Sequence, residues 1–260
     1  MKQYIVDAFA EELFTGNPAA ILPCKAMPAA GLMQKIAIEN QYSETAFVVR
    51  KGAGHYDLKW YTPGVEIDLC GHATLGAAFV IYNYFEPAEE LHFHTLSGEL
   101  IVTKDTAGYT LDFPRGKIKP VPVTGQIQKA AANLAVEAYY DGGDMVVLVP
   151  DETALKNFVP DSEQIRAVDG LGLILTAQSD TYDFVSRCFY PKLNVLEDAV
   201  TGRAHTFLAP IWAEKLGKTT MIARQISERG GILTVRLTEE RVFLTGNVQL
   251  FMEGDIPFDL

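Results

Sequence analysis

Basic residues are scarce in this sequence, where 22 Lys and Arg stand against 33 Asp and Glu for a formal net charge of -11 at pH 7. A nucleic-acid partner requires clustered Lys and Arg to neutralise phosphates, so this balance argues against one. Long hydrophobic runs are also missing. The longest apolar stretches, such as residues 75–81, fall far short of the roughly 20 residues that a membrane span needs. We therefore expect neither nucleic acid nor a membrane as a partner.

Cysteine is rare as well, since the chain has only three, Cys24, Cys70 and Cys188. Their spacing matches neither a CxxC motif nor a disulfide framework. Residues 1–7 are typical of a strand that starts at once rather than of a secretory signal. These features predict a cytoplasmic protein with reduced thiols.

Several common site motifs are absent: the sequence has no GxGxxG, no P-loop, no HExxH and no GxSxG nucleophile elbow. His92 and His94 would share one face of a strand, which could suggest a metal. The sequence shows no further ligands to complete a coordination set around them. We therefore interpret the two rings as part of an ordinary strand face and expect no metal there.

What the sequence does contain is an internal repeat. An aromatic-rich strand, a Pro turn, an acidic segment and a Gly-led helical run occur over residues 60–74 and again over residues 188–205. Gly71 and Gly202, which begin the two helical runs, are 131 residues apart (202 − 71), about half of the chain. Further matches on both sides keep nearly the same offset. We infer two copies of one unit.

Within each copy, short strands rich in β-branched and aromatic residues are separated by Gly and Pro. The run over residues 71–84 is apolar on nearly every side, and a helix without a polar face belongs inside a protein. We therefore expect each half to wrap its strands around its own central helix. Helices are predicted at residues 29–40, 71–84, 161–169 and 202–216.

The halves are expected to join near residues 116–124, where Lys and Pro interrupt regular structure. This places the two domains at residues 1–116 and 117–260, with allowance for the last strand to cross to the first domain.

Glu44 lies between a helical stretch and an apolar strand, next to Ala46, Phe47 and Val48. We expect these neighbours to desolvate its carboxyl in part, which suits a group that accepts and returns a proton near neutral pH. A capping or solvated Glu is the alternative.

The two Gly-led helix starts are candidates for binding an anion. The first turn of a helix presents unpaired backbone N–H groups and the positive end of the dipole, and Gly lets a ligand approach the backbone closely. If the halves face each other, the two starts could hold one substrate from two sides; plain helix caps are the alternative. The residues concerned are Gly71, His72, Ala73 and Thr74 in the first half and Thr201, Gly202 and Arg203 in the second.

Three side chains near these starts have more than one interpretation. Asp198 either takes part in the chemistry or is only a partner of the helix dipole. The dipole favours a neutral imidazole at His72, where a purely structural role is equally plausible. Cys70 precedes a helix start, a setting that lowers the pKa of a thiol, but Thr201 stands at the matched position of the second half.

Segments along nearly the whole chain resemble the PhzF (phenazine biosynthesis-like) family. Several long motifs in the right order make chance similarity an unsatisfactory explanation. The matching segments are VDAF at 6–9, FTGNPAA at 14–20, SETAF at 43–47, DLCGHATL at 68–75, LDFP at 111–114, EDAVTGRAH at 197–205 and SERGG at 227–231.

The resemblance implies the diaminopimelate epimerase-like fold. This is an α+β architecture of two pseudosymmetric halves, each a mostly antiparallel β-barrel around a central α-helix, with the site between them. It also implies that Glu44 shuttles a proton with His72 and Asp198 assisting, that no cofactor or metal is needed, and that the protein forms a homodimer. Substrate contacts are expected from Asn17, Cys70, Gly71, Ala73, Thr74, Thr201, Gly202 and Arg203.

Two positions depart from the family's usual pattern, since Ala199 stands where Pro is usual and Arg203 where Ser is usual. An Arg beside Gly202 either adds a bidentate clamp for a carboxylate or fills part of the pocket. The phenazine substrate is therefore not assumed.

The leading hypothesis is a cofactor-independent isomerase that moves a proton on a small carboxylated, anionic metabolite, with Glu44 as general acid/base in the interdomain cleft. An amino-acid racemase or epimerase of the same fold is one alternative, although such chemistry usually needs a thiol on each side and Thr201 replaces the second. A small-molecule binding protein without catalysis is the other alternative.

Overall fold

The computed structural model describes residues 1–257, so the last three residues of the predicted second domain lie outside the described part. The chain forms two compact units. The first contains Met1–Phe113 together with the chain from Phe243 onward, and the second contains Pro114–Val242. Strand β17 (Arg241–Gly246) leads the chain out of the second unit and back into the first.

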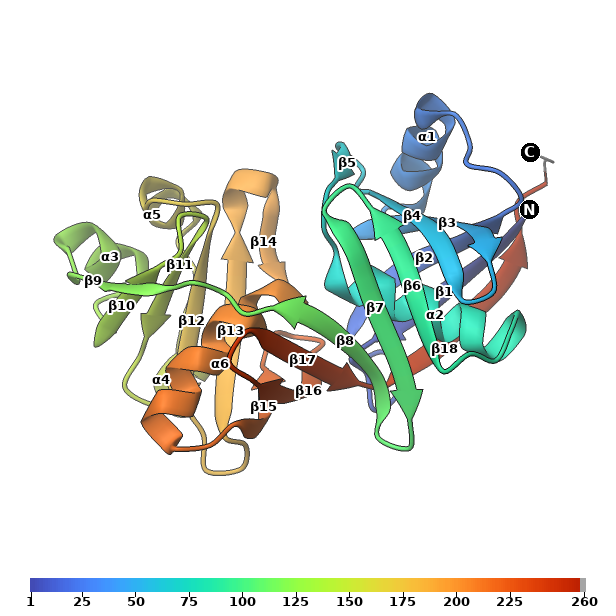
Figure 1. The fold of residues 1–260 in the computed structure, drawn as a ribbon. Coiled ribbons are helices and arrows are strands. Elements are labelled where there is room, and N and C mark those ends of the chain that lie inside the picture. The colour runs from blue at the N-terminus through green and yellow to red at the C-terminus, as the bar shows by residue number, and fades with distance from the viewer. Residues whose placement is uncertain (258–260) are drawn as a thin grey trace. The chain divides into compact units, whose positions relative to one another are not determined.

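The first unit consists of strands arranged around one helix, α2 (Gly71–Tyr84), as Figure 1 shows. A second helix, α1 (Ala30–Asn40), lies between two of the strands in sequence. The strands are β1 (Lys2–Ala8), β2 (Asn17–Cys24), β3 (Glu44–Gly52), β4 (His55–Tyr61), β5 (Glu66–Ile67), β6 (Glu90–Thr95), β7 (Gly98–Asp105), β8 (Gly108–Pro114) and β18 (Val248–Asp255).

Pairing in the first unit is mostly antiparallel. Strands β18, β1, β2, β3, β4, β6, β7 and β8 pair in this order, and β5 pairs with β4. Among the pairs just named, all within residues 1–257, β2–β3 and β4–β6 are the parallel ones. Parallel strands begin at the same edge of a sheet, and Ala19 near the start of β2 pairs with Glu44 at the start of β3. The candidate site described below lies at this edge, where β2 and β3 begin.

Helix α2 is buried because it has no polar face, and ten of its residues are buried. Its small residues let the strands come close. A Cβ atom at Gly76 would lie only 2.7 Å from Cγ2 of Val6 on β1. The packing therefore requires glycine at this position and fixes the helix against the sheet.

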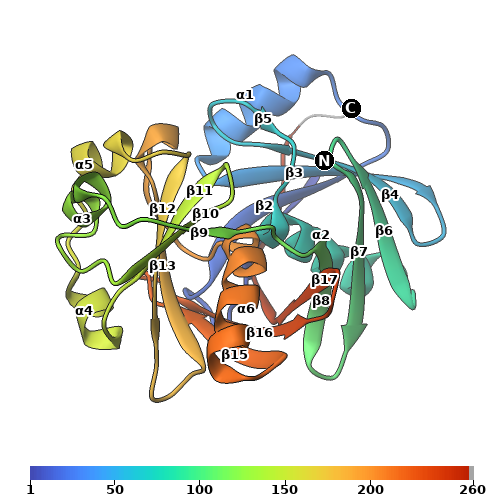
Figure 2. The same cartoon turned by 60° about the vertical axis from the view of Figure 1, so that its left-hand side comes forward.

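The second unit has α6 (Gly202–Leu216) as its longest helix, seen beside β15 and β16 in Figure 2. The other helices are α3 (Gly125–Ala130), α4 (Glu152–Asn157), α5 (Ser162–Ala167) and the 3-10 turn η1 (Pro191–Leu193). The strands are β9 (Lys119–Val121), β10 (Glu137–Tyr140), β11 (Asp144–Leu148), β12 (Gly172–Gln178), β13 (Phe184–Tyr190), β14 (Val195–Asp198), β15 (Thr220–Gln225) and β16 (Gly231–Leu237).

The second unit repeats the pairing order of the first. Its parallel pairs β11–β12 and β13–β15 correspond to β2–β3 and β4–β6, and the antiparallel pairs between them correspond as well. Helix α6 follows β14 as α2 follows β5. The predicted α+β fold of two pseudosymmetric halves, each mostly antiparallel around a central helix, is confirmed.

Helices α1, α2 and α6 confirm the predictions at 29–40, 71–84 and 202–216, whereas the helix predicted at 161–169 is limited to α5. Helices α3 and α4 were not predicted, because six residues are too few to display a helical period. No helix within residues 1–257 is long and apolar enough to span a membrane.

Candidate active site

The site in the first unit begins at the common edge of β2 and β3. Asn17 is the first residue of β2 and is fully buried. It follows Gly16, whose φ of 72° and close approach to the carbonyl oxygen of Ala8, 2.3 Å from where a Cβ would stand, exclude any side chain. Glu44 begins β3 at the same edge. The turn into β2 thus places an amide beside a carboxylate-bearing strand.

The first turn of α2 adds His72 to this edge. Its Nε2 atom lies 3.0 Å from Oε2 of Glu44, and its Nδ1 atom lies 3.3 Å from Nδ2 of Asn17. The His72 side chain is 7% exposed and that of Glu44 is 15% exposed. Three residues from three separate elements therefore form one nearly buried cluster.

The contact between His72 and Glu44 is an ion contact more than a hydrogen bond. Although the two atoms are close, the ring N–H is not aligned with the oxygen, and neither atom has a well-aligned partner among residues 1–257. Buried donors and acceptors without such partners are costly. Both atoms therefore keep hydrogen-bonding capacity that a bound molecule can use.

His72 favours the protonated form. Burial by itself lowers the pKa of its ring, but the sulfur of Cys70 and the carboxylate of Glu44 raise it, and the result lies well above the usual value. Near neutral pH the thiol is uncharged, so we regard the Glu44 carboxylate as the effective cause. The neutral imidazole expected from the helix dipole is therefore wrong: an anion at 3.0 Å outweighs the dipole.

Cys70 is the N-cap residue of α2, and its sulfur lies 3.5 Å from Nδ1 of His72. Burial raises the pKa of this thiol, with the Glu44 carboxylate acting in the same direction. The lowered pKa expected for a thiol at a helix start is therefore wrong, because loss of hydration dominates. The Thr74 hydroxyl donates to the Cys70 carbonyl oxygen and is thereby engaged within the helix.

The starts of α2 and α6 lack side-chain caps. Neither Cys70 nor Thr201 accepts a hydrogen bond from the first turn, whereas Thr124, Asp151 and Asp161 cap α3, α4 and α5. Unpaired N–H groups at a helix start form an anion site. Gly71 and Ala73, both buried, belong to the uncapped first turn of α2.

In the second unit, Asp198 ends β14 and accepts a hydrogen bond of 2.5 Å from the Thr201 hydroxyl. The fully buried Gln225 holds the same turn, accepting from the Thr201 backbone N–H at 2.8 Å and donating to the Asp198 carbonyl oxygen at 2.7 Å. Sequence reasoning missed Gln225. The sequence signal for Gln225 is the alternation of exposed and buried residues along β15. This alternation turns Met221, Ala223 and Gln225 toward the interior.

Arg203 follows Gly202 in the first turn of α6, and its guanidinium is engaged within its own unit. It donates to Asp144 and, at 3.3 Å, to Asp141, and it lies over the Phe207 ring. Asp144 is fully buried, and burial raises the pKa of its carboxyl against the opposing effect of Arg203. The two carboxylates, which the sequence analysis did not single out, compete with any substrate for this guanidinium.

Glu44, Cys70 and His72 also offer three ligand atoms that lie within 4.8 Å of one another. Zinc accepts carboxylate, thiolate and imidazole ligands, but it requires the thiol to be deprotonated. Burial raises the pKa of the Cys70 thiol, which adds to the cost of that deprotonation.

Comparison with known proteins gives consistent results. The family model described as phenazine biosynthesis-like protein matches residues 6–254. A protein of Pseudomonas aeruginosa named as an uncharacterized isomerase is 42% identical, and the match covers 96% of each chain. The crystal structure of a PhzF-family phenazine biosynthesis protein of Enterococcus faecalis superposes with a TM-score of 0.95 at 46% identity over 99% of each chain. A predicted epimerase of Pseudomonas aeruginosa, 19% identical with a TM-score of 0.74 over 99% of each chain, shares the fold.

Proposed function

The chain belongs to the phenazine biosynthesis-like family and is an isomerase, and from this premise we propose that Glu44 is the general acid/base that moves the proton. The observation that carries the proposal is the nearly buried pair of Glu44 and His72, with charged atoms 3.0 Å apart at the edge of a parallel strand pair. Buried titratable pairs of this kind are the usual means of acid/base catalysis.

In the proposed reaction, a Glu44 carboxylate oxygen removes a proton from one carbon of the substrate. The C–H electron pair moves into an adjoining conjugated system, a double bond shifts, and Glu44 returns the proton to another carbon. No atom is gained or lost and no net oxidation occurs, so we propose that neither a cofactor nor a metal takes part. The His72 ring, whose pKa is raised well above its usual value, places a positive charge 3.0 Å from this carboxyl before the first step.

The uncapped first turn of α2 is the proposed seat of the substrate's anionic group. Gly71 and Ala73 present backbone N–H groups there, and the N-cap residue Cys70 makes no side-chain cap hydrogen bond of good geometry. Asn17 lies against His72 and supplies an amide on the same edge. This arrangement supports a small carboxylated metabolite as substrate.

The remaining residues of the predicted site, Asp198, Thr201, Gly202 and Arg203, lie in the second unit and stay predictions. The pairing of Arg203 with Asp141 and Asp144 argues for a structural use of its charge rather than a substrate clamp. The homodimer also stays a prediction, which light scattering of the purified chain tests.

The experiment is a screen of a metabolite pool in deuterated water. Wild type is expected to place deuterium on carbon in its substrate, and Glu44→Gln is expected to lose this activity by about 10²–10⁴-fold. The matched control is Glu39→Gln, which removes the same charge from the exposed surface of α1 and should behave as wild type. Dialysis against a chelator should leave the wild-type rate unchanged.

Full activity of Glu44→Gln would reject the role of Glu44. Exchange at the α-carbon of free amino acids that is lost in Cys70→Ser but kept in Glu44→Gln would instead support a racemase. The raised pKa of Cys70 argues against that outcome, because a racemase base of this type must be a thiolate.

A further inference from the structure

Three of the five histidines of the chain gather on the outer side of the first unit. His55 begins β4, and His92 and His94 lie on β6. These strands are parallel and place His55 opposite His92. Because side chains alternate along a strand, His92 and His94 face the same way, while Leu91 and Phe93 are fully buried in the core.

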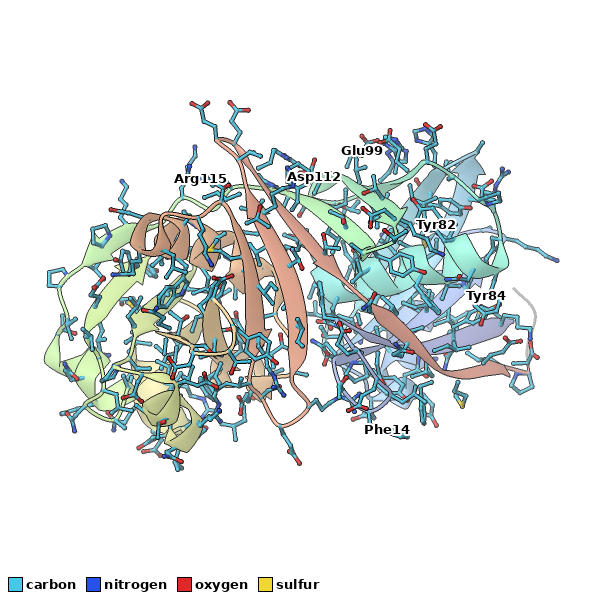
Figure 3. The ribbon with its side chains drawn as sticks, turned by 90° about the horizontal axis from the view of Figure 1, so that it is seen from below. Phe14, Tyr82, Tyr84, Glu99, Asp112 and Arg115 are labelled. Carbon is cyan, nitrogen blue, oxygen red and sulfur yellow. The ribbon has the colours of Figure 1, made fainter. Side chains whose placement is uncertain are left out.

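The histidine rings lie nearly parallel. The ring of His55 is 4.6 Å from that of His92, at an interplanar angle of 18°, and 5.5 Å from that of His94, at 7°. Glu99 on β7 pairs in register with His94, and its Oε1 atom lies 3.6 Å from Nδ1 of that ring. Figure 3 shows Glu99 on the side of the sheet away from α2. Strands β4 and β7 therefore bring His55 and Glu99 beside these rings, which the sequence did not reveal.

We propose that His55, His94 and Glu99 form a zinc site. Each offers one ligand atom, and these atoms all lie within 4.8 Å of one another. Nδ1 of His55 and Nε2 of His94 are 3.4 Å apart. Two nitrogens bound to one tetrahedral zinc at about 2.0–2.1 Å are separated by about 3.3–3.4 Å. Two imidazoles and a carboxylate are an established zinc ligand set that leaves a fourth position for water.

His92 supports the site without being a ligand. Its Nδ1 atom lies 3.3 Å from the second carboxylate oxygen of Glu99, and its Nε2 atom lies 2.9 Å from Oε1 of Glu90. His92 is thus held between two carboxylates and orients the one that would bind zinc. Such outer partners fix the direction of metal ligands.

The zinc site is separate from the proposed acid/base. His55 pairs with Gly52, which follows Glu44 by eight residues along β3 (52 − 44). At about 3.3 Å per residue, the distance along β3 from Glu44 to Gly52 is about 26 Å. A zinc ion here would join β4, β6 and β7 and stabilise the folded unit without touching the reacting carbon.

The test titrates zinc ions into the purified full chain against a zinc-binding dye. Wild type is expected to bind one equivalent. His94→Ala and Glu99→Gln are expected to weaken this binding by about tenfold or more, since even outer partners of metal ligands cost about 10–100-fold. Zinc should raise the melting temperature of wild type and not that of His94→Ala. Equal melting temperatures of the metal-free proteins would show that the variants fold.

Glu89→Gln is the matched control, because Glu89 is exposed just before β6 and lies outside the ligand set. It removes the same charge as Glu99→Gln and should leave zinc affinity unchanged. Equal affinity of wild type and His94→Ala would overturn the proposal. Zinc binding that survives His94→Ala but is lost in Cys70→Ser would also overturn it, by assigning the ion to the Glu44 cluster.

Discussion

Replacing His72 with Phe tests the central pair of the site without knowledge of the substrate. Phe resembles the imidazole in shape but has no ring N–H and no charge. The side chain of His72 is 7% exposed, so the new ring remains buried. The change leaves the Glu44 carboxylate, which is 15% exposed, without the cation that lies 3.0 Å away. We expect a substantial loss of folding stability.

The size of this loss follows from the geometry. Two unit charges 3.0 Å apart interact by about 5.5 kcal/mol at an effective dielectric constant of about 20, which sets a ceiling. Removing one partner of a buried pair costs about 3–5 kcal/mol, and the residual exposure of Glu44 places His72→Phe near the lower end, at about 3 kcal/mol. Glu44→Gln should cost less, about 1 kcal/mol, because the ring can release its proton and remain neutral.

The assay is urea unfolding at pH 7, followed by the fluorescence of Trp60 and Trp212, for wild type, both single variants and the double variant. Because the unpaired carboxylate is absent from the double variant, the two losses should not add, and the coupling energy should be about 2 kcal/mol. The pKa of His72 is raised in the folded protein. Its contribution to stability is therefore complete below the unfolded value of about 6.5 and is lost as the pH rises through the folded value.

Two results would refute this reasoning. One is a coupling energy below about 0.5 kcal/mol, which is the range of independent sites. The other concerns the difference in unfolding free energy between wild type and Glu44→Gln. The reasoning fails if this difference increases as the pH rises above about 6.5.

Other predictions concern the packing and the second unit. Gly76→Ala should lower the unfolding free energy by about 1–3 kcal/mol in urea titrations, since the new methyl group would lie 2.7 Å from Val6. Burial lowers the pKa of His205 to about 4, so wild type should lose up to about 3 kcal/mol as the pH falls from about 6.5 to about 4, and His205→Gln should lack this loss. Arg187→Met should cost about 3 kcal/mol or more by calorimetry, because it breaks the two short contacts to Glu197, 2.7 and 2.8 Å; an unchanged melting temperature would contradict this.

Much of the fold could be predicted because its signals are local or periodic. The apolar run of α2 requires burial wherever it occurs, and the spacing of Gly71 and Gly202 marks the repeat that both units display as matching strand order. Helices α3 and α4 were missed since their stability comes from caps and packing rather than from a pattern.

The candidate site was predictable only in part. Glu44 and His72 were named from motifs, but their contact depends on the register of β2 and β3 with the helix start. The partners of Arg203 are 59 and 62 residues away in sequence, and no spacing rule links them. The same holds for His55 and His94, because nothing in either segment reveals that β4 and β6 lie side by side.

The exchange of strands at the chain's end affects the order of folding during synthesis. Strand β1 needs β18 as its partner, with Lys2 opposite Asp255, so the first unit lacks this edge until β18 has been synthesised. The second unit is continuous from Pro114 to Val242 and has its complete sequence earlier. A nascent chain therefore carries β1 as an open edge, which can recruit foreign strands. The unit that is translated first is thus completed only after the second unit has its whole sequence.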